Sequence, residues 1–291
     1  MGSIRDKWRE FLEWQRRPHQ VAPMSEEHHR CHTCGQEFQG NYCPRCGQSA
    51  MIGRYSFKKA LLLFLDVWGL GNRGMFRTLR DLILRPGYMI RDYLSGMQMA
   101  YFPPFKLLFL LTALALVVES GFNLKGQNYF ELQREEVKKS TTVYMDLGEG
   151  TELPADQQQY NEQVEKYALV FLEYQQKFPN VTTLCLLLFL SGYLYYFFRR
   201  CPNIPDLRYS ELMVALVYSV NFQSIFQILT ELLCLGMGVQ YVLQLLPIIP
   251  LKQMSGYSWL RCIWYVALSF LMLMVMIVII SVALMNVKQV L

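Results

Sequence analysis

The stretch LCLLLFLSGYLYYFFRR, residues 184–200, contains no charged residue before its two final arginines. Together with the residues just before it, this stretch is long enough to cross a bilayer as a helix, which takes about 20 apolar residues. A second run, FLMLMVMIVIISVALM, covers residues 270–285. Because a lipid-exposed backbone must satisfy its own hydrogen bonds, these runs predict an all-α polytopic membrane protein.

The composition agrees with this class. The chain is 53% hydrophobic and 18% charged, whereas soluble proteins contain about 25% charged residues. The predicted membrane-crossing segments are roughly residues 104–122, 181–198, 212–235, 239–251 and 260–285. The fourth segment is short and contains Pro247 and Pro250, so it is either a short span or one arm of a re-entrant hairpin.

The charge distribution predicts the orientation in the membrane. Residues 1–103 hold 15 Lys and Arg against 9 Asp and Glu, whereas residues 123–179 hold 6 against 10. Since basic loops stay on the cytoplasmic side, we expect about five transmembrane helices with the N-terminus inside and the 123–179 segment outside. The same sidedness explains the net charge of +5, so a nucleic-acid partner is not expected.

The segment CHTCGQEFQGNYCPRCGQ, residues 31–48, contains two CxxCG motifs. Gly35 and Gly47 follow the second cysteine of each pair, where a left-handed backbone lets amide groups point at thiolates. Two such turns facing each other give tetrahedral sulfur ligation, which suits Zn²⁺. The predicted metal ligands are Cys31, Cys34, Cys43 and Cys46.

Disulfides are the alternative interpretation of these cysteines, but the predicted topology places them in a reducing compartment. Four thiolates complete the coordination shell, so His28, His29 and His32 are interpreted as surface residues. A closed ligand set makes the zinc ion a structural cofactor that does not activate water. The remaining cysteines have no metal spacing and are interpreted as small apolar residues: Cys185, Cys201, Cys234 and Cys262.

Residues 54–103 contain basic amphipathic helices. Pro86-Gly87 ends the main one, and a further helix is expected after Lys58-Lys59. Such helices either lie in the membrane interface or pack on the cytoplasmic ends of the spans. In the first case they meet membrane lipids with anionic headgroups. The candidate headgroup contacts are Arg73, Arg77, Arg80 and Arg85, opposite an apolar face of Met75, Phe76, Leu79, Leu82 and Ile83.

Polar residues within the third span form a stripe on one helical face. Its members, with one residue of the first span at similar depth, are Asn221, Ser224, Gln227, Glu231 and Glu119. Intramembrane polar groups usually face the bundle or a water-filled cavity. The stripe is therefore either a site for an ion, proton or substrate, or a set of interhelical hydrogen bonds.

Several short motifs in a fixed order carry a resemblance to a known family. After YCPxCGQ come Asp66, Arg77-Thr78-Leu79, Pro86-Gly87, Tyr93-Leu94-x-Gly96 and Tyr101-Phe102-x-Pro104-Phe105. This order resembles an uncharacterised (domain of unknown function) family of bacterial, mainly Bacteroidetes, zinc-ribbon multi-pass membrane proteins, over about residues 31–110. The resemblance implies a bacterial inner (cytoplasmic) membrane protein and supplies no activity.

The expected domains are a charged helical arm (1–27), a cytoplasmic zinc ribbon (28–50), interfacial helices (54–103) and a transmembrane domain (104–291) with the external loop 123–179. The chain has no phosphate-loop, HExxH or GxSxG motif, so enzymatic activity is not expected. The sequence favours a non-enzymatic scaffold or adaptor whose zinc ribbon docks a cytoplasmic protein partner. The alternative is a transporter or lipid-handling protein that uses the polar stripe, and a membrane enzyme acting on lipid ranks third.

Overall fold

The structure is a computed structural model of the 291-residue chain. It describes residues 4–20, 23–24, 26–50, 73–121, 134–135, 137–139, 155–233, 235 and 237–290. The basic helix expected after Lys58-Lys59 and most of the first half of the 123–179 segment lie outside the described residues.

Four helices in the described part of the chain are long and apolar enough to cross a membrane. They are α5 (Pro104–Gly121), α8 (Pro179–Phe198), α9 (Tyr209–Leu232) and α12 (Trp259–Val290). Both α5 and α8 begin at a proline, whose fixed φ angle suits the first helical turn. These helices correspond to four of the five segments that the sequence predicts to cross the membrane.

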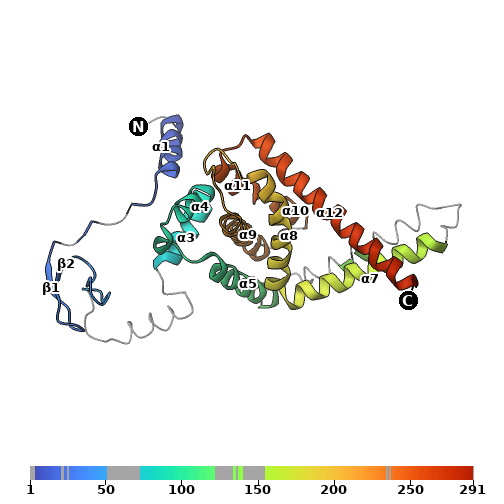
Figure 1. Cartoon of the computed structure of the whole chain (residues 1–291), viewed down its shortest axis with the longest axis horizontal. Coiled ribbons are helices and arrows are strands. Elements are labelled where there is room, and N and C mark those ends of the chain that lie inside the picture. Colours follow the sequence, from blue (N-terminus) through green and yellow to red (C-terminus); the bar gives the residue numbers. More distant parts are fainter. Residues whose placement is uncertain are drawn as a thin grey trace.

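α9 lies at the centre of the helical bundle and is seen nearly end-on in Figure 1. It packs along α5, and the two helices run in the same direction. Asn221, midway along α9, bonds the carbonyl of Pro104 at the start of α5. Glu231 near the end of α9 lies close enough to Glu119 near the end of α5 to interact electrostatically. α8 and α12 form a second packed pair beside α9.

The fourth predicted segment is not one helix. It forms α10 (Met237–Leu243) and α11 (Ile248–Ser255), which are joined by a turn and are both too short to span a bilayer alone. α11 ends against the loop between α8 and α9, where Asn203 donates a hydrogen bond to the carbonyl of Met254 at 3.1 Å. Because α9 starts from that loop, the α10–α11 pair returns the chain to the end of the bundle from which α9 departs.

The basic region folds onto this bundle as α3 (Arg73–Leu84), α4 (Pro86–Leu94) and the short 3₁₀ helix η1 (Gln98–Ala100). The predicted break at Pro86-Gly87 is confirmed, since α3 ends two residues before α4 begins. The predicted apolar face of α3 is only partly correct. Leu82 and the polar Thr78 are buried, whereas Phe76 is 65% exposed.

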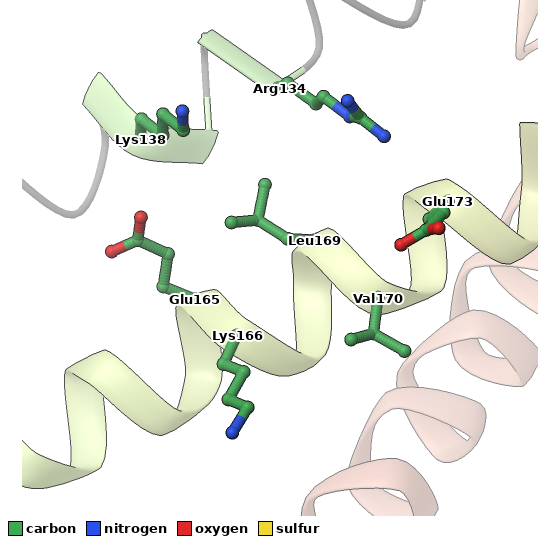
Figure 2. Close-up of a pocket in the computed structure, with 7 residues that line it drawn as sticks. All are labelled: Arg134, Lys138, Glu165, Lys166, Leu169, Val170 and Glu173. Atoms are coloured by element: carbon green, nitrogen blue, oxygen red, sulfur yellow. The ribbon is translucent and has the colours of Figure 1, made fainter.

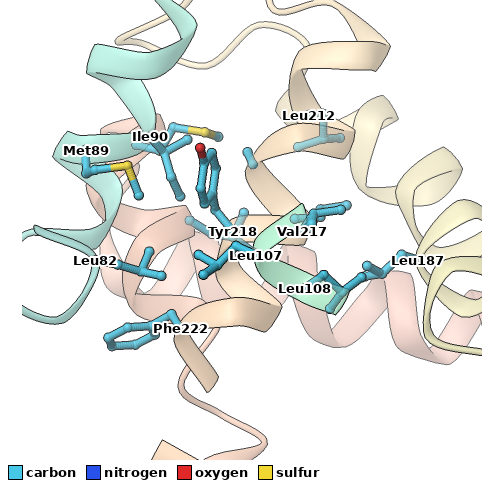
Figure 3. Close-up of a cluster of buried hydrophobic side chains, with 14 of the residues drawn as sticks. Leu82, Met89, Ile90, Leu107, Leu108, Leu187, Leu212, Val217, Tyr218 and Phe222 are labelled. Carbon is cyan, nitrogen blue, oxygen red and sulfur yellow. The ribbon is translucent and has the colours of Figure 1, made fainter. Parts of the chain in front are cut away.

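Apolar side chains of α3 and α4 join those of the membrane helices in a single core. Figure 3 shows Leu82, Met89 and Ile90 beside Tyr218 of α9 and Leu107 of α5. All five side chains are at most 3% exposed, and burial of each large apolar side chain contributes about 1.5–3 kcal/mol. The packing favours the expectation that these helices lie against the bundle.

The remaining elements are peripheral. α1 (Ile4–Arg16) precedes the hairpin of β1 (His28–Arg30) and β2 (Glu37–Gln39), which are antiparallel. α7 (Ala155–Lys177) leads directly into α8.

Gly87 marks the closest approach between α4 and α11. A Cβ atom at this position would lie 2.3 Å from Cβ of Gln253 and 2.5 Å from the carbonyl oxygen of Pro250. We therefore expect Gly87→Ala to destabilise the fold by about 1–3 kcal/mol through overpacking, measured as a lower thermal midpoint of the purified protein. Gly192→Ala is the matched control, since a Cβ there meets nothing within 4 Å. Equal midpoints for the two variants would contradict the packing of α4 on α11.

Candidate functional site

Each CxxCG motif forms a tight turn at the end of a two-stranded segment. The first lies between β1 and β2, and the second lies between Tyr42 and Ser49, which form an isolated bridge. Gly35 and Gly47 both have a φ angle of +74°, as the sequence predicts. Their amides donate to the carbonyls of Cys31 and Cys43, each at 2.9 Å, so the two turns share one geometry.

The four predicted ligands come together in space. Their sulfur atoms all lie within 4.8 Å of one another. The distance is 3.4 Å between Sγ of Cys31 and Cys46 and 3.6 Å between Sγ of Cys34 and Cys43. Zinc–sulfur bonds of about 2.3 Å in a tetrahedron place sulfur atoms about 3.8 Å apart, so the cluster fits a thiolate-bound metal ion. These spacings are too long for disulfide bonds, and the cysteines are free.

The surroundings of the sulfur cluster support metal ligation. A backbone N–H of Cys34 stabilises the Cys31 thiolate and lowers its pKa to about 6, which favours the form that binds metal. His28 and His32 are exposed. The ring of His29 packs against the ring of Phe38, with 5.7 Å between the ring centroids. None of the three joins the metal-ligand group among the described residues, in agreement with their interpretation as surface residues.

A second polar cluster lies inside the basic region, around Arg85. Its side chain is 3% exposed and pairs with Asp92, and its Nε lies 3.9 Å from Asp81. The Tyr101 hydroxyl lies 3.3 Å from Asp81 and 3.2 Å from Asp92. The guanidinium also donates to two backbone carbonyls at the end of α1. This buried ionic network ties α1, α3, α4 and the segment before α5 together.

The network changes the interpretation of the candidate headgroup contacts. Arg85 lies in the protein interior among its own partners, and it is not available to a lipid headgroup in this structure. Arg77 is half-buried and donates to a backbone carbonyl of η1 at 3.2 Å. Arg80 has a side chain that is 57% exposed while it pairs with Asp81 at 2.7 Å. The side chain of Arg73 lies outside the described part of the structure.

A cavity of about 590 Å³ lies between the long helices. Side chains of α5, α8, α9 and α12 line it, and the α10–α11 pair closes one side. At the end where α7 joins α8, the lining includes Glu119, Glu231 and Gln175. At the opposite end, where α8 meets the start of α9, the lining is apolar and includes Leu194 and Leu216. The cavity therefore has a polar end and an apolar end.

The structure brings four of the five predicted stripe residues to this cavity: Glu119, Ser224, Gln227 and Glu231. The fifth, Asn221, is fully buried and donates to the carbonyl of Pro104 at 2.9 Å, so it serves the packing of α9 on α5. One buried carboxylate oxygen of Glu119 and one of Glu231 have no hydrogen-bond partner among the described residues.

Sequence reasoning missed four glutamines of the lining, which are Gln175, Gln223, Gln240 and Gln244. Gln223 of α9 bonds Gln244, and Gln240 of α10 bonds Thr230. The sequence did contain a signal, because Gln223, Gln227 and Glu231 are spaced by four and share a helical face. The cavity-facing stripe is therefore centred closer to Gln223 than to Asn221. Gln240 and Gln244 have the same spacing within the broken fourth segment.

A further pocket of about 510 Å³ lies between α7 and the short segment that carries Arg134 and Lys138. Figure 2 shows these basic side chains on one side and Glu165 and Glu173 of α7 on the other. Charges of opposite sign face each other across an open groove, which indicates contact between two parts of the chain. We assign no binding function to it.

Comparison with known proteins gives one partial match. Residues 72–116 match the model of a family described as protein of unknown function (DUF3667). The matched region contains α3, α4, η1 and most of α5, and thus the Arg85 network. No curated protein and no solved structure matches the chain. The match supports the resemblance to an uncharacterised family, and it assigns no activity.

The cysteine cluster predicts that the purified chain binds one metal ion. Cys43→Ser should lose it, because three ligands with an open position hold a structural ion less tightly than four. Elemental analysis of the full-length protein by mass spectrometry measures the ratio of metal to chain. Cys185→Ser is the control, since Cys185 is an exposed thiol on α8 outside the cluster. Equal metal content in the two variants would contradict the assignment of ligands.

Proposed function

We propose that this chain is an integral membrane protein that binds an amphiphilic, lipid-like molecule in the cavity between α5, α8, α9 and α12. This lipid-handling function is carried by one observation: the cavity has a polar end with two carboxylates and an apolar end lined by leucines. A water-filled cavity for a small ion does not need long apolar walls. A purely structural stripe would be packed against neighbouring helices, and it would leave no cavity.

The size and the access of the cavity support this proposal. Its volume of about 590 Å³ lies within the range of about 300–1,000 Å³ that is typical of small-molecule sites. Several apolar lining residues are also exposed, among them Leu245, Ile263 and Phe270. In a membrane these residues face acyl chains, so an amphiphile has a route into the cavity from the bilayer.

Filling the cavity tests the proposal. Ala115 of α5 lines the cavity, whereas its neighbour Leu114 does not and is 48% exposed. We expect Ala115→Trp to occupy the space and to abolish retention of an amphiphile by protein purified in mild detergent. Leu114→Trp should retain it, because it adds the same side chain on the outer face. Mass spectrometry of the extracted molecules measures the ratio of ligand to protein.

Two results would count against a binding cavity. One is a wild-type chain that carries no stoichiometric amphiphile. The other is a pair of tryptophan variants that retain the same molecules in the same amounts.

The location and the metal follow from supporting arguments. We propose that the chain lies in a bacterial inner membrane with its N-terminus in the cytoplasm, on the basis of the basic N-terminal region. The α10–α11 pair, which returns the chain across the bundle, is compatible with the five predicted membrane-crossing segments. We propose Zn²⁺ as the metal, because four thiolates within 4.8 Å suit its tetrahedral preference. In this site it would have a structural role.

The scaffold hypothesis remains a second candidate. The observation that favours it is the cluster of four cysteines. Four thiolates would fill every coordination position of a tetrahedral metal ion, so the ion would have a structural and not a catalytic role. If the module docks a cytoplasmic partner, affinity capture with the full chain should recover a protein that Cys43→Ser loses. Recovery of the same proteins by both chains would contradict a docking role. Retention of the amphiphile by Cys43→Ser would show that the two roles are separate.

A further inference from the structure

The geometry points to a ligand whose polar head is a primary ammonium group, attached to an apolar chain and carrying no phosphate. This inference rests on the proposed function and specifies its ligand class. Its basis is the pair of unpartnered carboxylate oxygens at the polar end of the cavity, together with a described lining that holds no basic side chain.

The two carboxylates are the first acceptors. A buried oxygen of Glu119 and another of Glu231 have no hydrogen-bond partner among the described residues. An unpaired polar atom in a low-dielectric environment is destabilising, and more so when it is charged. Since both side chains line the cavity, a cationic donor placed there would supply the partner that each oxygen lacks.

Buried amides add further acceptors. Gln223 and Gln240 line the cavity and are 9% and 6% exposed. An amide nitrogen of Gln223 donates to Gln244 at 3.0 Å, and one of Gln240 donates to Thr230 at 3.1 Å. In the described part of the chain no donor bonds the amide oxygen of either glutamine. Both oxygens are thus acceptors within the cavity wall.

The hydroxyl groups of the lining are also turned into acceptors. Thr112, Ser219 and Ser224 each donate to the backbone carbonyl four residues earlier in their own helix, at 2.8, 2.8 and 3.0 Å. This common arrangement uses the hydroxyl hydrogen and leaves the oxygen lone pairs for another donor. The hydroxyl hydrogens of these three lining residues are therefore engaged within the protein.

The charge of the lining excludes an anionic head. Among the described residues that line the cavity there is no lysine, arginine or histidine. A phosphate or carboxylate head would face two glutamates with no basic group to compensate, which is unfavourable by several kcal/mol. A cationic head has the opposite sign and matches both carboxylates.

A primary ammonium also suits the site better than a quaternary one. Proteins recognise quaternary ammonium groups mainly through several aromatic faces, and the aromatic side chain in the described lining is Phe270. A quaternary group has no N–H to offer to the orphan oxygens. A primary ammonium has three such donors on a compact head.

Competition among four probes with the same chain tests this inference on the full-length protein in nanodiscs. The probes are dodecylamine, dodecanol, dodecanoate and dodecyltrimethylammonium, and empty nanodiscs measure partition into lipid. We expect dodecylamine to bind about tenfold or more tightly than each of the others, because it alone offers N–H donors and positive charge. Glu231→Gln and Glu119→Gln should each remove most of this preference for dodecylamine. Glu173→Gln on α7, outside the cavity, should behave as the wild type.

The outcomes separate the ligand class from the proposed function. If dodecanol, dodecanoate or dodecyltrimethylammonium binds as tightly as dodecylamine, and Ala115→Trp abolishes that binding, the cavity binds amphiphiles but the ammonium inference is wrong. The ammonium inference is also overturned if Glu119→Gln and Glu231→Gln both keep the full preference for dodecylamine. If none of the probes binds saturably, the proposed function fails together with the inference. If Glu119→Gln and Glu231→Gln have the same thermal midpoint as the wild type, their lost preference for dodecylamine does not come from loss of the fold.

Discussion

A polar side chain on a helix that crosses a membrane needs a hydrogen-bond partner, and the rest of this structure depends on how α9 meets that need. α9 satisfies this need differently along its length. In its first half, the Tyr218 hydroxyl donates to the carbonyl of Phe102 at 2.6 Å, and Asn221 donates to the carbonyl of Pro104. The Phe102 carbonyl lies before two prolines and outside α5, so it needs this external donor. Near its C-terminal end Thr230 accepts a hydrogen bond from Gln240, whereas one buried oxygen of Glu231 has no partner among the described residues and Glu231 lines the cavity.

The first half of α9, where Tyr218 and Asn221 find their partners, is held by the region that matches the family model. Thr78 of α3 accepts a hydrogen bond from the amide of Phe102 at 2.7 Å, and the Arg85 network fixes the adjacent Tyr101. A buried ion network of this kind is expensive to break, because removal of one partner leaves an uncompensated charge. Residues 72–116 thus fix how α5 packs along α9. The polar end of the cavity lies at the other end of this helix pair, near Glu119 and Glu231.

Much of the architecture could be predicted from the sequence. The spacing of Cys31, Cys34, Cys43 and Cys46 suffices for the metal cluster, because a CxxCG turn is local and its glycines set its geometry. The long apolar runs likewise predict the four long helices. The burial of Arg85 could not be predicted, since it depends on Asp92 and on carbonyls of α1 that are distant in sequence. The role of Asn221 also depends on a distant contact, because its partner at Pro104 is set by how α5 packs on α9.

The most direct test of this account is a cryo-electron microscopy map of the full-length protein in lipid nanodiscs. The account predicts an elongated density between α5, α8, α9 and α12, with its wider end near Glu119 and Glu231 and its tail near Leu194 and Leu216. Helices packed together with no space between them, and with both glutamates bonded to neighbouring protein groups, would contradict it.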